Sequence, residues 1–128
     1  MELVTNRTSG ATYEYTDLNR VEGAVKQIES NFGDLGITKS FITKTDWKAP
    51  EDYSPAEWVT QKQMERYLKN IAAIKELFPN SIRIPASMEN LTYTGANNIE
   101  KVLLIALQRI DGIKQTFQYS GEMYAGEE

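Results

Sequence analysis

Apolar residues recur every three or four positions in three separate parts of the chain, which is the spacing of one face of an α-helix. This pattern predicts helices over residues 16–32, 60–78 and 94–118. The apolar positions are Leu18, Val21, Val25, Ile28 and Phe32 in the first, Met64, Tyr67, Leu68, Ile71, Ile74 and Phe78 in the second, and Ile99, Leu103, Ala106, Ile110, Ile113 and Phe117 in the third. Each helix has one apolar face and none is expected to be stable alone. The fold class is therefore mainly α, a three-helix bundle in a single domain of residues 1–128.

A threonine stands at each predicted helix start. Thr16, Thr60 and Thr94 are expected to be N-caps, whose hydroxyl groups accept hydrogen bonds from the free N–H groups of the first turn. The stretch "TQKQ" at residues 60–63 has the form of a capping box, in which Gln63 reaches back to the N–H of Thr60.

The segment between the first two helices has no helical period. Its prolines and short polar residues indicate turns, and we expect an ordered connector held in place by Trp47, Tyr53 and Trp58. Alternating apolar residues in 37–43 and 81–85 also predict a minor two-stranded β ribbon. At the other end, glycines at 121 and 126 favour a flexible, acidic C-terminal tail over residues 119–128.

One short sequence occurs twice. "YTDLNRVE" at residues 15–22 returns as "YTGANNIE" at 93–100, with Tyr, Thr, Asn and Glu at the same offsets. We interpret both copies as helix starts, in which Asn19 and Asn97 reach back toward the caps. Duplication of a half-domain and convergence on a good helix start both explain the repeat, and convergence is favoured because the similarity is short.

Composition excludes several classes of function. The 128 residues include no cysteine and no histidine, so disulfides, thiolate nucleophiles and the usual zinc sites are ruled out. A net charge of −4 is opposite in sign to a nucleic-acid-binding surface, and no apolar run is long enough for a membrane span. We expect no nucleic-acid partner, no membrane partner and synthesis in the cytoplasm.

Candidate catalytic and metal-binding residues are few. The acidic cluster of Asp46, Glu51 and Asp52 lacks the ligand spacing of a calcium loop, so a solvated loop is the favoured interpretation. No nucleophile elbow, phosphate-binding glycine loop or zinc-protease motif is present. We therefore predict a protein that is not an enzyme and needs no cofactor or metal.

Aromatic residues outside the helical stripes are the candidate interface, since Tyr and Trp are enriched in protein contacts. They are Trp47, Tyr53, Trp58, Tyr119 and Tyr124. For Trp47 and Trp58 a structural role in covering the bundle is the favoured alternative. For Tyr119 and Tyr124, which follow the last core position, a role in contacts is favoured.

Five stretches in order along the chain resemble a family of proteins encoded by prophages of Gram-positive bacteria. They are "YTDLNRVE" (15–22), "KTDW" (44–47), "QMERYLKN" (63–70), "MENLTYTGANNIE" (88–100) and "YSGEMYAGE" (119–127). The resemblance covers almost the whole chain and implies a virion component associated with the phage tail. It supplies no catalytic residues.

The sequence thus predicts a non-enzymatic structural or interaction module of a phage tail. It would assemble with other virion proteins or with itself through its aromatic surface and its C-terminal tail. The alternative is a module that binds a small molecule or a cell-wall glycan on Trp47 and Trp58. A carboxylate-based hydrolase of such glycans is a weaker third hypothesis.

Overall fold

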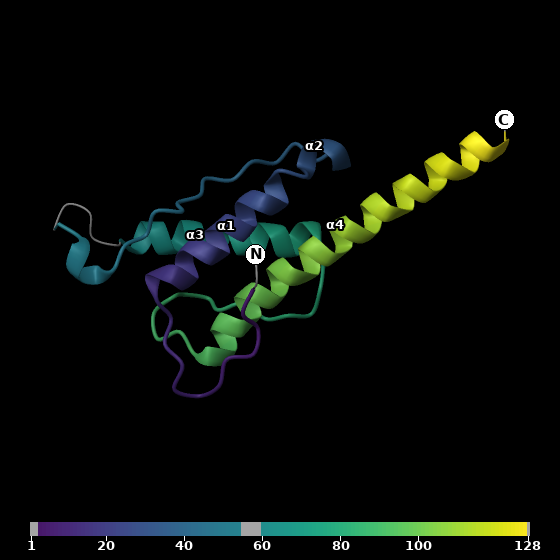
Figure 1. The fold of residues 1–128 in the computed structure, drawn as a ribbon. Helices are drawn as coiled ribbons and strands as arrows, with labels where there is room; N and C mark the ends of the chain where they lie inside the picture. The colour runs from purple at the N-terminus through teal and green to yellow at the C-terminus, as the bar shows by residue number, and fades with distance from the viewer. Residues whose placement is uncertain (1–2, 55–59, 128) are drawn as a thin grey trace.

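The computed structural model describes residues 3–54 and 60–127, and it describes their side chains except at Pro50 and from residue 116 onward. Within this part the chain is mainly helical, as predicted (Figure 1). In chain order the elements are α1 (Tyr15–Glu29), α2 (Phe32–Leu35), the 3-10 turn η1 (Pro50–Asp52), α3 (Gln61–Leu77) and α4 (Tyr93–Glu127).

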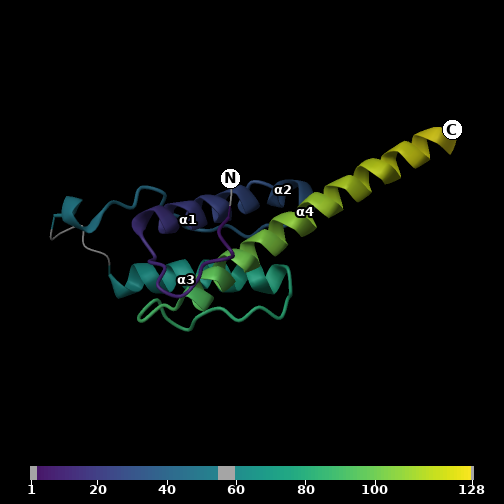
Figure 2. The ribbon, with the colours of Figure 1, turned by 60° about the horizontal axis from the view of Figure 1, so that its bottom comes forward.

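Helices α1, α3 and α4 pack around one core, and α4 crosses both of the others (Figures 1 and 2). Most residues of the three apolar stripes face this core. Its buried members are Val21, Ala24, Val25 and Ile28 of α1, Tyr67, Leu68, Ile71 and Ile74 of α3, Ile99, Val102, Leu103, Ala106 and Ile110 of α4, and Phe32 and Phe78 beside them. The bundle therefore follows from the 3-4 spacing, because each stripe removes its apolar surface from water only against the other two.

The first helix is shorter than the sequence predicted. It ends at Glu29, because Ser30 Oγ and Asn31 Nδ2 both donate to the carbonyl of Gln27, at 2.6 and 2.9 Å. The chain then turns into the short helix α2. That helix ends at Gly36, whose φ of 71° is the left-handed conformation that glycine adopts without strain.

Two of the three predicted N-caps lie elsewhere. Thr60 caps α3, with Gln63 N–H donating to its Oγ1 at 3.2 Å and Gln63 Oε1 accepting from Thr60 N–H at 3.1 Å. For α1 the N-cap is Glu14 in place of Thr16. For α4, Thr92 in place of Thr94 accepts from the N–H of Gly95 at 3.0 Å. Both helices thus begin at the tyrosine of the repeat, and the threonine lies inside the first turn.

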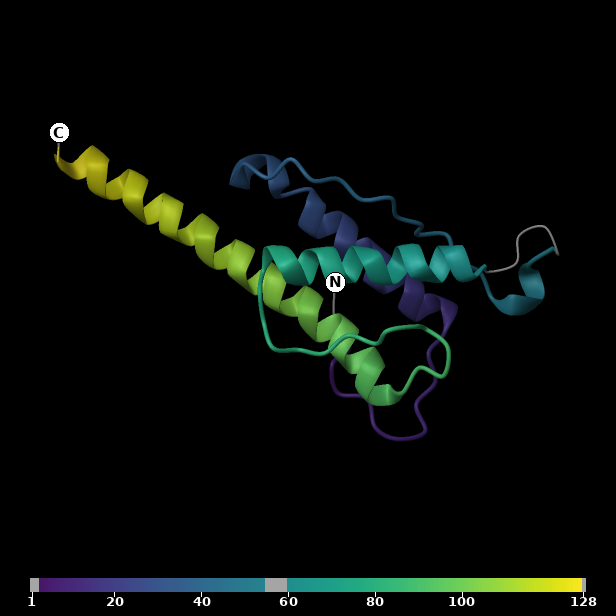
Figure 3. The same ribbon diagram turned by 180° about the vertical axis from the view of Figure 1, so that it is seen from behind.

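The predicted β ribbon is not formed, since residues 37–43 and 81–85 are both without strand in the described structure. The two segments lie on opposite sides of α3 (Figures 1 and 3). Side chains of the helices bind their backbone groups instead. The N–H of Phe41 donates to Glu29 at 3.2 Å, and the carbonyl of Arg83 accepts from Asn98 at 2.9 Å.

Helix α4 has 35 residues and projects far beyond the other helices at its C-terminal end (Figures 1–3). The sequence predicted that this helix would end near residue 118 and that a flexible tail would follow. The structure continues the helix to Glu127, because Gly121 and Gly126 lower helix propensity without blocking a helical hydrogen bond as proline does. Within the described residues, no helix combines the length and the hydropathy that crossing a bilayer requires.

Candidate functional site

The repeated sequence places an asparagine and a glutamate one helical turn apart on α1 and again on α4. The pairs are Asn19 with Glu22 and Asn97 with Glu100, and each pair faces an extended segment from a distant part of the chain. We call Asn19 and Glu22 clamp 1, and Asn97 and Glu100 clamp 2. Both glutamates are completely buried, with 1% and 0% exposure.

Clamp 1 binds residues 44–47 of the connector. The side-chain amide of Asn19 bonds to both backbone groups of Trp47, accepting from its N–H at 2.7 Å and donating to its carbonyl at 2.9 Å. Glu22 accepts from the N–H of Lys44 at 3.0 Å and from the indole N–H of Trp47. The charge of Glu22 is balanced by Arg66 of α3, at 2.6 Å.

Clamp 2 binds residues 4–7 by the same contacts. The amide of Asn97 accepts from the N–H of Arg7 at 2.9 Å and donates to its carbonyl at 3.0 Å. Glu100 accepts from the N–H of Val4 at 2.9 Å and from the guanidinium of Arg7. Arg20 of α1 adds two further hydrogen bonds to Glu100, both 2.8 Å long.

The two clamps therefore recognise an extended segment in the same register. The asparagine binds the N–H and the carbonyl of the segment's fourth residue, and the glutamate binds the N–H of its first residue and the side chain of its fourth. The prediction that Asn19 and Asn97 reach back to the helix caps is wrong, because both amides are fully engaged by these distant segments. The repeat marks a shared binding geometry as well as a helix start.

Asp17 and Arg20 extend clamp 2 into a network of four charged groups. Asp17 pairs with Arg7 at 3.0 Å and also with Arg20, so two carboxylates face two guanidinium groups. Burial favours the neutral form of Arg7, but its hydrogen bonds to Glu100 and Asp17 outweigh that cost and raise its pKa. For Arg20 the hydrogen bond to Glu100 is the largest cause of a raised pKa. The two guanidinium groups are thus held in their charged forms.

A pair of tyrosines fixes the chain between residue 7 and α1. The hydroxyl groups of Tyr13 and Tyr67 bond to each other in the interior, and the guanidinium of Arg7 lies 5.4 Å from the centre of the Tyr13 ring. Burial is the main reason that the pKa of each tyrosine is raised. Both phenols are therefore neutral hydrogen-bonding groups at physiological pH.

Of the five predicted interface residues, the structure buries one and partly buries another. Trp47 has only 3% exposure, so its ring is unavailable as an exposed contact or as a platform for sugars. Tyr53 is half-buried, and its hydroxyl accepts from the N–H of Lys48 at 2.8 Å. Trp58 lies outside the described residues. Tyr119 and Tyr124 lie on α4, and their side chains are likewise outside the described part.

The predicted acidic cluster stays dispersed on the surface. Asp46, Glu51 and Asp52 are exposed, and Asp46 pairs with Lys44 at 2.8 Å, whose hydrogen bond lowers the pKa of the aspartate. Among the described residues, no group of acidic side chains is arranged to hold a metal ion.

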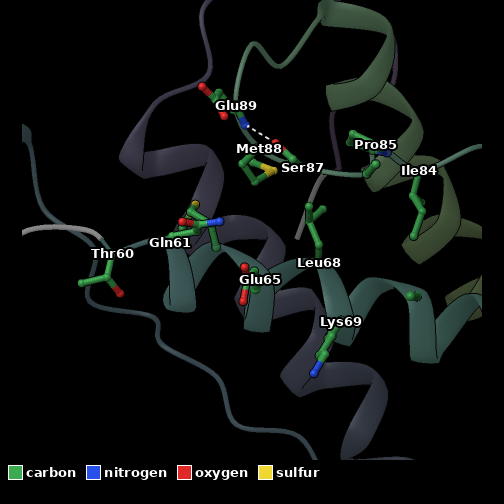
Figure 4. Close-up of a pocket in the computed structure, with 13 residues that line it drawn as sticks. Thr60, Gln61, Glu65, Leu68, Lys69, Ile84, Pro85, Ser87, Met88 and Glu89 are labelled. Carbon is green, nitrogen blue, oxygen red and sulfur yellow. Dashed lines mark hydrogen bonds between the residues drawn. The ribbon is translucent and has the colours of Figure 1, made fainter.

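An open groove of about 940 Å³ runs between the outer face of α3 and residues 84–89 (Figure 4). Leu68, Ile84 and Met88 give it an apolar floor, while Glu65 and Lys69 of α3 stand at its exposed rim. The N–H of Glu89 donates to Ser87 Oγ at 2.9 Å, which fixes the turn above the groove.

A second groove, of about 730 Å³, lies at the point where α4 leaves the bundle. It is lined by Leu35, Ile37, Leu77, Phe78, Arg109, Gly112 and Ile113. Two of these apolar side chains are exposed, Leu77 at 36% and Ile113 at 38%. One turn earlier on α4, Ile110 is only 3% exposed. The boundary between core and exposed apolar surface is therefore sharp.

Comparisons of this chain with protein-family models, with curated proteins and with solved structures found no match. The most informative sequence signal for the clamps is the repeat itself. In each copy a glutamate follows an apolar core residue directly, Val21 before Glu22 and Ile99 before Glu100. Glu22, Glu100 and the arginines that bind them have no other signal in the sequence, because their partners are distant along the chain.

Proposed function

We propose that this chain is a non-enzymatic structural module of a phage or prophage tail, and that it assembles through the end of the bundle from which α4 projects. The single observation that carries the proposal is the exposed apolar surface of Leu77 and Ile113 at the base of the part of α4 that projects beyond the other helices (Figure 3). Placement in a phage tail comes from the resemblance of the five sequence stretches alone.

We take the partner at this surface to be a second copy of the chain. The apolar spacing of α4 continues past the bundle in the sequence, from Ile110 and Ile113 to Phe117 and Tyr124. A seam whose residues are three, four and seven positions apart is the pattern by which helices pair side by side. Two projecting helices that pair would remove both seams from water, including the two exposed residues at the base.

The buried carboxylates support a structural role over a catalytic one. Both oxygens of Glu22 and both oxygens of Glu100 accept hydrogen bonds from the chain's own donors. Within the described residues, no buried side-chain polar atom lacks a hydrogen-bond partner. A general acid or base needs an oxygen that faces the substrate, and these glutamates offer none.

Light scattering over a wide concentration range tests the assembly proposal. We expect the full chain to form a discrete oligomer and Ile113→Glu to shift it toward monomer by about tenfold or more in dissociation constant, because the variant places a charge in the seam. Gln115→Glu is the matched control, since it adds the same charge at an exposed position of the same helix. Equal association of the two variants, or a monomer throughout, would refute self-assembly through α4. Immunodetection of the chain in purified virions of the phage that encodes it tests the tail assignment separately.

A further inference from the structure

Clamp 2 binds its segment as a peptide-binding site binds a ligand. Most of its contacts reach backbone groups of residues 4–7, and the side chain that it recognises is the guanidinium of Arg7. Residues 3–7, which we call the arm, add the side chain of Leu3 at the edge of the core. The contacts that hold the arm are local to the clamp. They would therefore be the same if the arm came from another molecule.

Without the arm, clamp 2 is short of one positive charge. The groups that remain are the carboxylates of Asp17 and Glu100 and the guanidinium of Arg20. Two negative charges then face one positive charge at a site where Glu100 is wholly buried while the arm is bound, so leaving the site unfilled is costly. An empty clamp 2 thus favours an extended segment with an arginine at its fourth position.

The linker between the arm and α1 is built like a hinge. Residues 8–12 are all exposed, and they extend away from the helices in two opposite views (Figures 1 and 3). A turn closes from the N–H of Ala11 to the carbonyl of Thr8 at 3.1 Å. Gly10 within it has φ of 92° and open space around it. Opening such a linker breaks one turn and leaves the core intact.

We propose that the arm exchanges between molecules when its linker disfavours return to its own clamp, so that residues 3–7 of one copy fill clamp 2 of a second copy. Each clamp in the exchanged pair is then completed by the partner's Arg7, and the exposed linkers run between the two bundles. Exchange of an identical element through a hinge is a route to dimers that requires no new contact surface. This contact involves neither Ile113 nor Leu77 and is independent of assembly through α4.

Shortening the linker tests the proposal on an otherwise complete chain. Deleting Ser9, Gly10 and Ala11 removes up to about 10 Å of reach, which disfavours return of the arm to its own clamp relative to the clamp of a second copy. We expect the mass in solution to double while the helical circular dichroism is retained. Replacing the same three residues by Gly–Ser–Gly keeps the length and is the matched control, which we expect to leave the mass unchanged.

A synthetic peptide of residues 1–8 separates arm exchange from association through α4. Excess peptide should return the shortened chain to the mass of the full-length chain, and the same peptide with Arg7→Ala should have no effect. A folded shortened chain whose mass does not rise, or a doubled mass that excess peptide leaves unchanged, would overturn the proposal.

If the shortened chain does not fold, the full-length Arg7→Ala variant gives the answer, because its own arm no longer supplies the missing charge. A fluorescently labelled peptide of residues 1–8 should then bind with a saturable rise in anisotropy, and the Arg7→Ala peptide should bind at least tenfold more weakly. Equal binding of the two peptides, or none by either, would overturn the proposal.

Discussion

Clamp 1 and clamp 2 bind backbone in the same way but differ in the side chain that they receive. At clamp 1 the single carboxylate of Glu22 is balanced by Arg66, and the fourth residue of the segment is a neutral tryptophan. At clamp 2 the carboxylates of Asp17 and Glu100 face one fixed arginine, Arg20, and the segment supplies a second. Each site is thus electrically neutral when its segment is bound.

The comparison shows that the register of the bound segment and the choice of its fourth side chain have different causes. The Asn–x–x–Glu spacing sets the register of the bound segment, since an amide and a carboxylate one turn apart match backbone groups three residues apart. The local count of charges selects the side chain at the fourth position, because an uncompensated charge in a buried site is costly. The same eight-residue sequence therefore supports two different partners.

The largest expected effect comes from removing the charge of the buried glutamates. Glu100→Gln leaves two arginines facing Asp17 alone, and we expect it to lower the free energy of unfolding by about 3–5 kcal/mol. Glu22→Gln leaves only Arg66, whose side chain keeps 21% exposure, and should cost about 1–3 kcal/mol. Urea titration followed by circular dichroism measures both. Equal losses of unfolding free energy in the two variants would contradict the claim that the number of charges distinguishes the two clamps.

Truncating the asparagines tests the backbone binding that the two clamps have in common. Asn19→Ala and Asn97→Ala each remove two hydrogen bonds to the backbone of a segment, and Asn97→Ala also removes a longer one, of 3.3 Å, from the guanidinium of Arg7. Each variant should cost about 2–3 kcal/mol. The control is Asn98→Ala, which removes one bond to the carbonyl of Arg83 and should cost about 1 kcal/mol or less. A large difference between the first two variants would show that the clamps are not equivalent.

Variants at the two tryptophans test whether Trp47 is the buried side chain held by clamp 1 or an exposed platform for sugars. Trp47→Phe keeps an aromatic ring but loses the N–H that donates to Glu22, and should cost about 1.5–2 kcal/mol. In a Trp58→Phe background, the remaining emission of Trp47 should be blue-shifted and poorly quenched by acrylamide. Sugars that quench this emission would restore the glycan-binding hypothesis at Trp47.

The smallest expected effect is a loss of folding stability at acid pH as Asp17, next to clamp 2, becomes protonated. Burial raises the pKa of Asp17, but hydrogen bonds from the backbone of Glu14 and from two arginines outweigh it, so the folded value lies below the ordinary 3.8. The stabilisation by Asp17 is therefore present above this ordinary value and is lost as the pH falls through the lower folded value. Asp17→Asn should flatten the loss of stability below about pH 4.

Much of the fold could be predicted because helices are specified locally. The 3-4 spacing of residues such as Val21, Val25 and Ile28 identified the core face of α1, and the capping box of Thr60 located the start of α3. The caps of α1 and α4 were misplaced by two residues, since tyrosine and threonine fit the first turn as well as the cap. The predicted ribbon failed because helix side chains satisfy the backbone of both segments, and a local pattern contains no information on that competition.

The sequence alone determined the three helical stripes, the absence of thiol and imidazole chemistry and the existence of the repeat. Only the tertiary structure decided what the repeat does and which aromatic residues are accessible. The segments held by the clamps lie 22 to 28 residues from Asn19 and Glu22 and 90 to 96 residues from Asn97 and Glu100. Contacts across such separations form only when the packed helices bring the segments together. The burial of Trp47 and the pairing of Arg7 with Glu100 are therefore properties of the folded chain.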